Sequence, residues 1–171
     1  MNLEQPPIPN RRPNVARNAL KIIIFTGFVV GTLDMLGAIV VYQADPARMF
    51  RFIASGAFGA GTAFSGGAIM VVWGIVFHYA IAFAWTIVFF FVYPWLPILG
   101  KNKYITGALY GVFIWLIMNK VVIPLSAIAS GPFDLKSAAI GASILIVAVG
   151  VPISLLTHRY YTRKGILRGN S

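Results

Sequence analysis

The chain has 171 residues, of which 58% are hydrophobic and only 11% are charged, and its net charge is +10. A soluble domain carries about 25% charged residues, so this composition excludes an ordinary soluble globular protein. The chain has no cysteine, which excludes disulfides, thiolate zinc sites and cysteine nucleophiles. No nucleic-acid-binding signature accompanies the basic charge. We therefore expect the lipid bilayer, and not nucleic acid, as its partner.

Residues 1–19 are polar, basic and rich in proline, and we expect them to be a mobile cytoplasmic segment. The apolar run that follows contains Asp34 and is longer than the core of a signal peptide, which has about 7–15 residues. We therefore predict an uncleaved first span over residues 20–42. Within it, Gly27 and Gly31 lie on the same helix face as Asp34, because residues three or four apart share a face.

The segment after the first span starts with Asp45 and Pro46, a pattern that favours a helix with an Asp N-cap. We predict a short amphipathic helix at the outer surface, with Arg48 and Arg51 facing headgroups or water. The glycine-rich residues 56–67 have two alternatives. They form a plain surface loop, which we favour, or they re-enter the membrane, which is tolerated only where protein covers the backbone.

Three further apolar runs cover residues 68–93, 104–124 and 137–158. Each holds the ~20 residues that a helix needs to cross ~30 Å of hydrocarbon. The predicted fold is an all-α membrane protein with four transmembrane helices, and with a short amphipathic or re-entrant segment between the first and the second. The transmembrane domain spans residues 20–158, and a basic cytoplasmic tail covers residues 159–171.

Small residues recur at helical spacing in the second and third spans. Gly74 and His78 share one face of the second span, and Gly107 and Gly111 form a stripe that continues toward Asn119 in the third. Stripes of small residues mark places where helices approach closely. The polar side chains on these faces should therefore meet neighbouring helices and not lipid.

Polar residues inside a span usually face the bundle interior or water, and they are functional candidates. We predict an intramembrane cluster of Asp34, His78 and Asn119, in which the Asn119 amide joins neighbouring helices. Lys120 falls on the side of its helix opposite Gly111 and can extend toward the surface. An ion pair between Asp34 and Lys120 is the alternative. Asp34 and His78 are too few ligands for zinc, so we expect no metal.

The positions of Lys and Arg predict the orientation, because basic residues gather in cytoplasmic loops. Ten of them lie before the first span, between the second and third, or after the fourth. Both termini are therefore expected in the cytoplasm. On the other side lie Arg48, Arg51, Lys136 and also Lys120.

Five stretches occur in order along the chain: IASGAFGAGTAFSGG, GIVFHYAIAF, FVYPWLP, ITGALYG and LIMNKVVIPLSA. Together they resemble a group of small, uncharacterised bacterial four-span membrane proteins that is distantly similar to YagU-like inner-membrane proteins. The resemblance covers about residues 25–128. It implies a bacterial inner-membrane location and, for the YagU-like group, an association with acid resistance. The positions of this chain that match the family's motifs are His78, Gly107, Gly111, Asn119 and Pro124. Lys120 differs, because the resemblance implies an apolar or aromatic residue there.

Two functions follow from these patterns. The favoured one is a non-enzymatic structural or accessory role in a homo-oligomer or a larger membrane complex, since the chain is small and carries 13 Phe and several small-residue stripes. The alternative is a small channel or transporter that moves protons or a small solute past Asp34, His78 and Asn119, with protonation of His78 as the switch. No set of nucleophile, base and metal emerges, so we expect neither an enzyme nor a cofactor.

Overall fold

The computed structural model describes residues 12–95, 102–128 and 134–163, and within these ranges it is almost entirely helical and contains no strand. Four of its helices are long and apolar enough to cross a membrane. They cover Arg17–Tyr42, Gly67–Trp95, Lys103–Leu125 and Leu135–Arg163. The four apolar blocks of the sequence therefore correspond to the four long helices.

Helix α1 (Arg12–Tyr42) starts earlier than the predicted first span. Part of the segment that we expected to be mobile is therefore helical, and residues 1–11 lie outside the described residues. At the other end of α1, Gln43 adopts a left-handed backbone with φ 47°. This conformation is uncommon for a residue with a side chain, and here it turns the chain sharply into the next helix.

Helix α2 (Pro46–Phe58) follows the predicted capping pattern. The Arg48 backbone N–H donates to Asp45 Oδ1 at 2.7 Å, and Pro46 occupies the first turn. Gly59 then takes φ 77°, which breaks the helix, and the chain resumes as α3 (Ala60–Ser65). The expectation of a plain loop over residues 56–67 is wrong, because the chain breaks only at Gly59 and at Gly66, and the residues between them are helical.

Helix α4 (Gly67–Val92) continues into the short 3₁₀ turn η1 (Tyr93–Trp95). The third long helix consists of α5 (Lys103–Ile117), the π-helical segment η3 (Met118–Val122) and the last turn α6 (Ile123–Leu125). Asn102 caps its start by accepting from two backbone N–H groups of the first turn.

The fourth long helix also contains a π-helical segment. It consists of α7 (Leu135–Ile144), η4 (Leu145–Gly150) and α8 (Val151–Arg163). Pro152 is the second residue after η4. Because proline has no N–H and its ring collides with the carbonyl four residues earlier, it favours a local departure from α-helical bonding.

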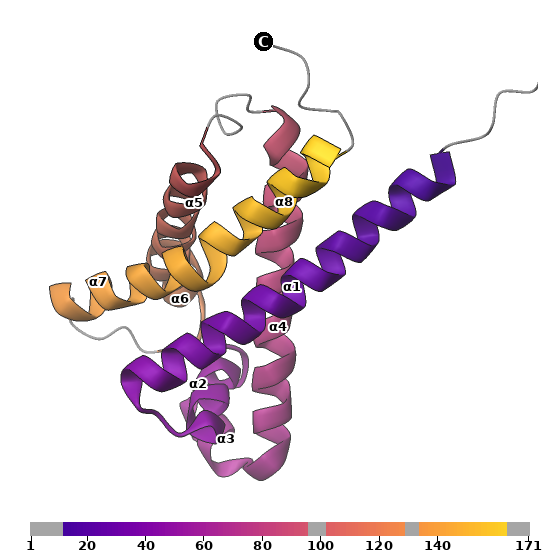
Figure 1. The fold of residues 1–171 in the computed structure, drawn as a ribbon. Coiled ribbons are helices and arrows are strands. Elements are labelled where there is room, and N and C mark those ends of the chain that lie inside the picture. Colours follow the sequence, from indigo (N-terminus) through magenta and orange to yellow (C-terminus); the bar gives the residue numbers. More distant parts are fainter. Residues whose placement is uncertain (1–11, 96–101, 129–133, 164–171) are drawn as a thin grey trace, which may run out of the picture.

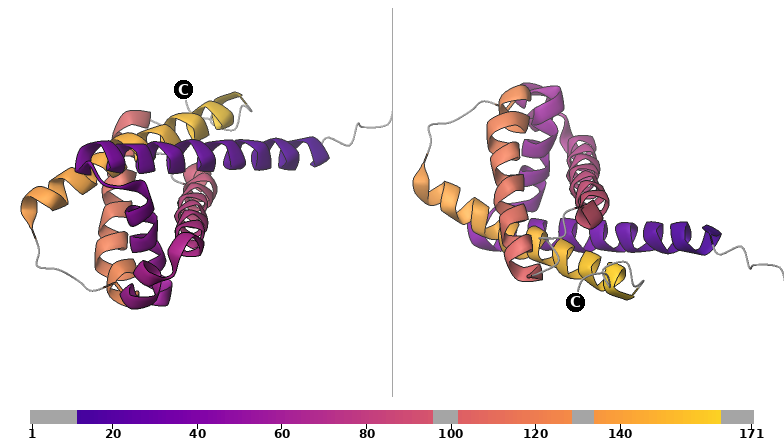
Figure 2. Two further views of the ribbon diagram at one scale, coloured as in Figure 1. Left: turned by 90° about the horizontal axis from the view of Figure 1, so that it is seen from below. Right: turned by 90° about the horizontal axis from the view of Figure 1, so that it is seen from above.

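Successive long helices run in alternating directions (Figure 1). Helices α7 and α8 run beside α1 in the opposite direction, and α2 and α3 lie between the end of α1 and the start of α4 (Figures 1 and 2). The start of α1 and the end of α8 therefore lie toward the same end of the molecule, which we call the terminal end. The end that holds α2 and α3 is called the α2 end.

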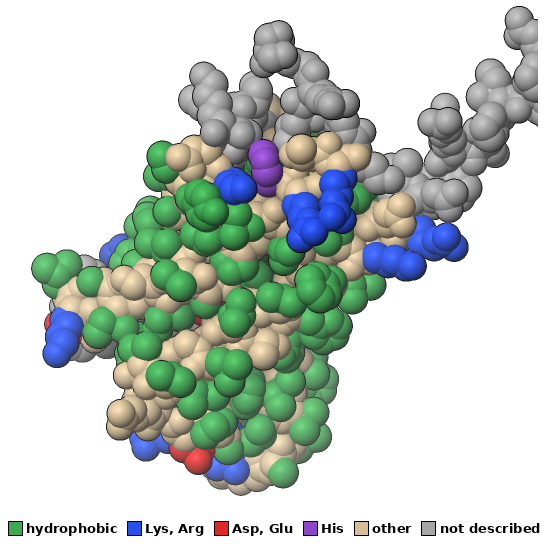
Figure 3. Space-filling model, viewed as in Figure 1, with side chains coloured by type: hydrophobic (Ala, Val, Ile, Leu, Met, Phe, Trp, Pro, Cys, Tyr) green, Lys and Arg blue, Asp and Glu red, His purple; other side chains and the backbone are tan. Residues whose placement is uncertain are grey.

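The surface shown in Figure 3 is mostly apolar across its middle. Lys and Arg side chains gather toward the terminal end, with smaller groups toward the α2 end. A broad apolar band between two charged ends is the pattern of a protein whose middle faces acyl chains.

Candidate functional site: a cavity open at the α2 end

A cavity of about 1250 Å³ lies between α4 and the third long helix. Four further elements complete its wall: α1, α2, α7 and η4. The exposed residues Asp134 and Ser137, at the start of α7, belong to the lining, as does Ser126 at the end of the third helix. The cavity therefore opens at the α2 end. Its deepest lining residues lie near the middle of the long helices and include Val30, Ala82, Trp85, Ile114 and Val149.

Aromatic packing closes the molecule beyond the cavity. The Tyr110 hydroxyl donates to the Trp85 carbonyl at 2.7 Å, and the Tyr110 ring lies 4.5 Å from that of Phe89. Farther along, Tyr93 stacks on Tyr161 at 5.7 Å and is 1% exposed. The terminal end is thus filled with side chains, and the residues that line the cavity stop short of it.

Asp34 and His78 lie together in the cavity wall. His78 Nε2 donates to the Gly31 carbonyl at 2.8 Å, which places the imidazole against α1 one turn from Asp34. The two ionisable groups interact electrostatically. Among the described residues, no hydrogen bond reaches the Asp34 carboxyl group, which is only half-buried. It therefore presents its oxygens to the cavity.

Asn119 lines the same cavity, but its bonding differs from the prediction. Its Nδ2 donates to the Trp115 carbonyl of its own helix at 2.9 Å, so this bond does not join two helices. The acceptor is the carbonyl four residues earlier, the same pattern by which Thr86 and Ser143 bond to their own helices.

Lys120 lies within η3, is exposed and also lines the cavity. Gly111, opposite which it was predicted, contacts the fourth helix instead. Lys120 takes part in an interaction of its own. The electrostatic partner of Asp34 is His78, and the ion pair between Asp34 and Lys120 stays a prediction.

Helix α2 forms part of the cavity wall and does not simply rest on the surface. Phe52 and Ile53 line the cavity, and the Phe50 ring lies 6.3 Å from that of His78. Arg48 is exposed as predicted. Arg51 is half-buried instead, and its Nε is buried without a hydrogen bond to any described residue.

The five glycines singled out in the sequence all lie at close contacts within the chain. A Cβ on Gly27 or Gly31 would collide with an aromatic ring of α4, and one on Gly74 would collide with the backbone of α2 at Phe50. On Gly107 and Gly111, a Cβ would come within 2.6 Å of a Cα atom of the fourth helix. Gly150, which the sequence analysis missed, meets the backbone of Gly107 and Gly111 at the same crossing.

At the mouth of the cavity, Asp134 caps α7. Its Oδ2 accepts from the Ser137 backbone N–H at 2.8 Å. Hydrogen bonds from the Ser137 side chain and backbone hold the pKa of Asp134 below its ordinary value. This carboxylate is therefore already bonded within the protein, unlike that of Asp34.

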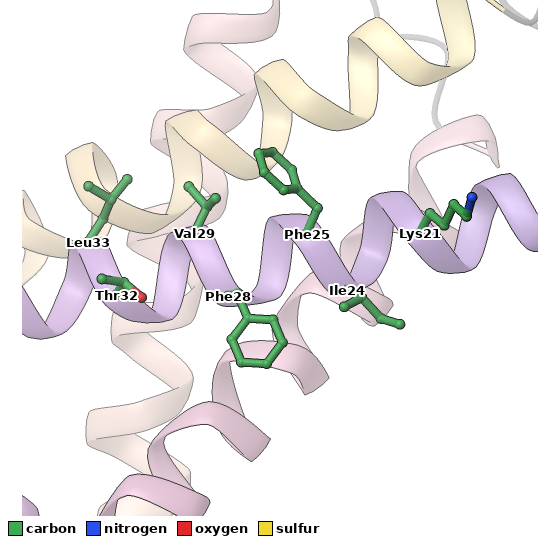
Figure 4. A pocket seen from close by; sticks show the side chains of 7 residues that line it. All are labelled: Lys21, Ile24, Phe25, Phe28, Val29, Thr32 and Leu33. Carbon is green, nitrogen blue, oxygen red and sulfur yellow. The ribbon is translucent and has the colours of Figure 1, made fainter.

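A second hollow lies on the outer side of α1 (Figure 4). It is lined by one helix only, and six of its seven lining residues carry apolar or hydroxyl side chains. Phe25, Val29 and Leu33 project to one side of the helix and Phe28 to the other (Figure 4). Such an open apolar surface is what acyl chains cover in a membrane, so we do not place the functional site there.

The sequence analysis did not identify some of the functional candidates. Trp85 and Trp115 line the cavity, and Tyr93 O–H pairs with His158 Nδ1 at 2.8 Å where the terminal end is closed. The aromatic residues gave no signal, because a tryptophan in an apolar span looks the same whether it faces lipid, core or cavity.

Comparisons with protein-family models, with curated proteins and with solved structures found no match. The resemblance to YagU-like proteins therefore stays a prediction.

Proposed function

We propose that this protein is a small multi-pass carrier of the bacterial inner membrane that takes up a small solute, or protons, from the α2 end. The observation that carries the proposal is the cavity of about 1250 Å³, which reaches the α2 end, has no lining residue at the terminal end and is lined by Asp34, His78 and Asn119. A cavity that extends only partway along the long helices suits a carrier with alternating access better than a permanently open pore. In this proposal both termini are cytoplasmic, so that the cavity faces outward.

The side chains suit such a role because charged and polar groups inside a membrane are costly and mark solute or proton pathways. Asp34 and His78 lie at the depth where α1 and α4 are held together by the bond between His78 and Gly31. A change in the charge of His78 would act on that contact. Protonation of His78 is thus the proposed switch between open and closed arrangements.

The rival role, a structural or accessory component, depended partly on the expectation that a small-residue stripe would be left for another chain. The five glycines named in the sequence are matched by aromatic rings or backbone of this chain. Their stripes therefore give no support to a homo-oligomer or a larger complex.

Labelling of single introduced cysteines tests whether the cavity holds water. Because the chain has no native cysteine, no other residue reacts with the thiol reagent. Ala84 is exposed and lines the cavity, whereas Ile87 is exposed on α4 at nearly the same depth but does not line it. A charged thiol reagent that does not cross membranes should modify Ala84→Cys and leave Ile87→Cys unmodified in intact bilayers. If neither Ala84→Cys nor Ile87→Cys reacts with the reagent, the proposal is contradicted and the accessory role is favoured.

Flux in proteoliposomes tests the carrier mechanism. Modification of Ala84→Cys should block proton or solute flux, and His78→Ala should reduce it strongly. Undiminished flux through His78→Ala protein would eliminate the proposed switch.

A further inference from the structure

The cavity contains one carboxyl group, that of Asp34, that accepts no hydrogen bond from any described residue. Asp34 is the single acidic residue within the four long apolar helices. No hydrogen bond from a described residue reaches it, and its electrostatic partner is the imidazole of His78. Asp134, the other carboxylate of the lining, already accepts the hydrogen bond of its helix cap.

His78 and Asn119, which line the cavity with Asp34, each use a donor within the protein. His78 Nε2 donates to the Gly31 carbonyl at 2.8 Å. Asn119 Nδ2 donates to the Trp115 carbonyl, and its Oδ1 accepts no hydrogen bond from a described residue. A carboxyl group that accepts no hydrogen bond from a described residue favours a positively charged ligand over an anion.

Aromatic side chains form much of the wall. Five line the cavity, from α1, α2, α4 and α5. The Trp115 indole nitrogen and the Tyr42 hydroxyl both approach Gly141, whose missing side chain leaves room between them. Aromatic faces attract cations within about 6 Å, and they also accept the apolar body of a ligand. The five residues are Tyr42, Phe52, Phe77, Trp85 and Trp115.

From these observations we infer that the ligand of the cavity is an organic cation, which places its positive charge at Asp34 and its apolar body against the aromatic wall. This inference rests on the proposed function and names its substrate class. The volume of about 1250 Å³ is far larger than an inorganic ion or a proton requires. It is of the order of pockets that hold drug-sized molecules, which are roughly 300–1,000 Å³.

The test uses two ions of nearly the same size and shape and of opposite charge, tetraphenylphosphonium and tetraphenylborate. Binding of each radiolabelled ion to the purified full-length protein in detergent is measured by equilibrium dialysis. We expect saturable binding of the phosphonium and none of the borate. Asp34→Asn should weaken phosphonium binding at least about tenfold, and the matched variant Asp45→Asn, at an exposed carboxylate outside the cavity lining, should leave it within about twofold.

Two controls separate the possible failures. The thermal unfolding midpoint of Asp34→Asn, and reaction of its Ala84→Cys derivative with the thiol reagent, show whether the fold and the cavity persist. Equal binding of both ions, or phosphonium binding that survives in folded Asp34→Asn protein, overturns the cation inference. If Ala84→Cys reacts while the phosphonium fails to bind, the substrate class is wrong but the carrier proposal stands. If Ala84→Cys does not react, the proposed function itself fails.

Discussion

His78 has a fixed role at the contact between α1 and α4. A backbone carbonyl can only accept, so the bond of 2.8 Å to Gly31 requires a proton on Nε2. The imidazole is thereby held against α1 beside Asp34, and its Nδ1 keeps no hydrogen bond to a described residue. One side chain thus joins two helices and contributes a titratable atom to the site.

We expect His78→Leu to destabilise the protein by about 0.5–1.5 kcal/mol, because the Gly31 carbonyl loses its donor in a buried contact. His78→Gln keeps an N–H donor of similar reach and should recover most of the loss. Thermal unfolding in detergent, followed by circular dichroism, measures both variants. Equal stability of the leucine and glutamine variants would show that the bond contributes nothing.

At the residue scale, the sequence predicted which polar side chains belong to membrane-spanning helices but not how each is bonded. Helical periodicity placed Asp34 and His78 on small-residue faces, where the structure also has them. It did not show that Lys120 would line the cavity, and it missed the bond of Asn119 to its own helix. Both lie in η3, where the α-helical period no longer holds, and no residue type announces a π-helical turn.

Among the helices, α5 and the fourth helix cross closely. Gly107, Gly111 and Gly150 bring the two backbones together there. In a membrane, such contact depends on van der Waals packing, since lipid tails are as apolar as the side chains. The π-helical segment η4 ends at Gly150, so the irregular turn and the crossing occupy the same place.

We therefore expect Gly111→Ala to destabilise the protein by about 1–3 kcal/mol, because the added methyl group collides with backbone that cannot move aside. Gly61→Ala is the matched control, since a Cβ on Gly61 meets nothing within 4 Å. It lies within α3 and should raise stability by less than about 1 kcal/mol. The thermal unfolding midpoints of both variants measure the effect. A Gly111→Ala protein as stable as the parent would contradict the tight crossing.

The sequence predicted the existence of α2 and its cap, but not its place in the fold. Local chemistry at Asp45 and Pro46 determines where this helix starts. Its packing against Gly74 and His78 depends on residues far along the chain, and an amphipathic pattern does not say whether lipid or protein covers the apolar face. For this reason the half-buried Arg51 was not anticipated.

At the scale of the whole molecule, the long helices alternate in direction and the described ends lie toward one side (Figure 1). Long apolar blocks made this much predictable from the sequence. The cavity was not predictable, because it depends on how far α4 and α5 diverge beyond the contact of Tyr110 with Trp85 and Phe89.

The arrangement leads to a prediction about topology. Ala60, in α3, and Thr162, near the end of α8, are both exposed and lie toward opposite ends of the molecule. In intact cells stripped of any outer barrier, an impermeant thiol reagent should modify Ala60→Cys and not Thr162→Cys. In inverted membrane vesicles the pattern should reverse. Modification of both from the same side would contradict the proposed orientation.

The two π-helical segments have a consequence for how this chain tolerates insertions and deletions. Each widened turn is equivalent to one surplus residue within an α-helix. Deleting one residue between Met118 and Val122 would let ordinary α-helical bonding close, and it would rotate everything beyond by about 100° relative to Trp115. The positions facing the cavity in this part of the chain are therefore set by residue count as much as by residue type, so a shortened variant would present a different wall without a single substitution.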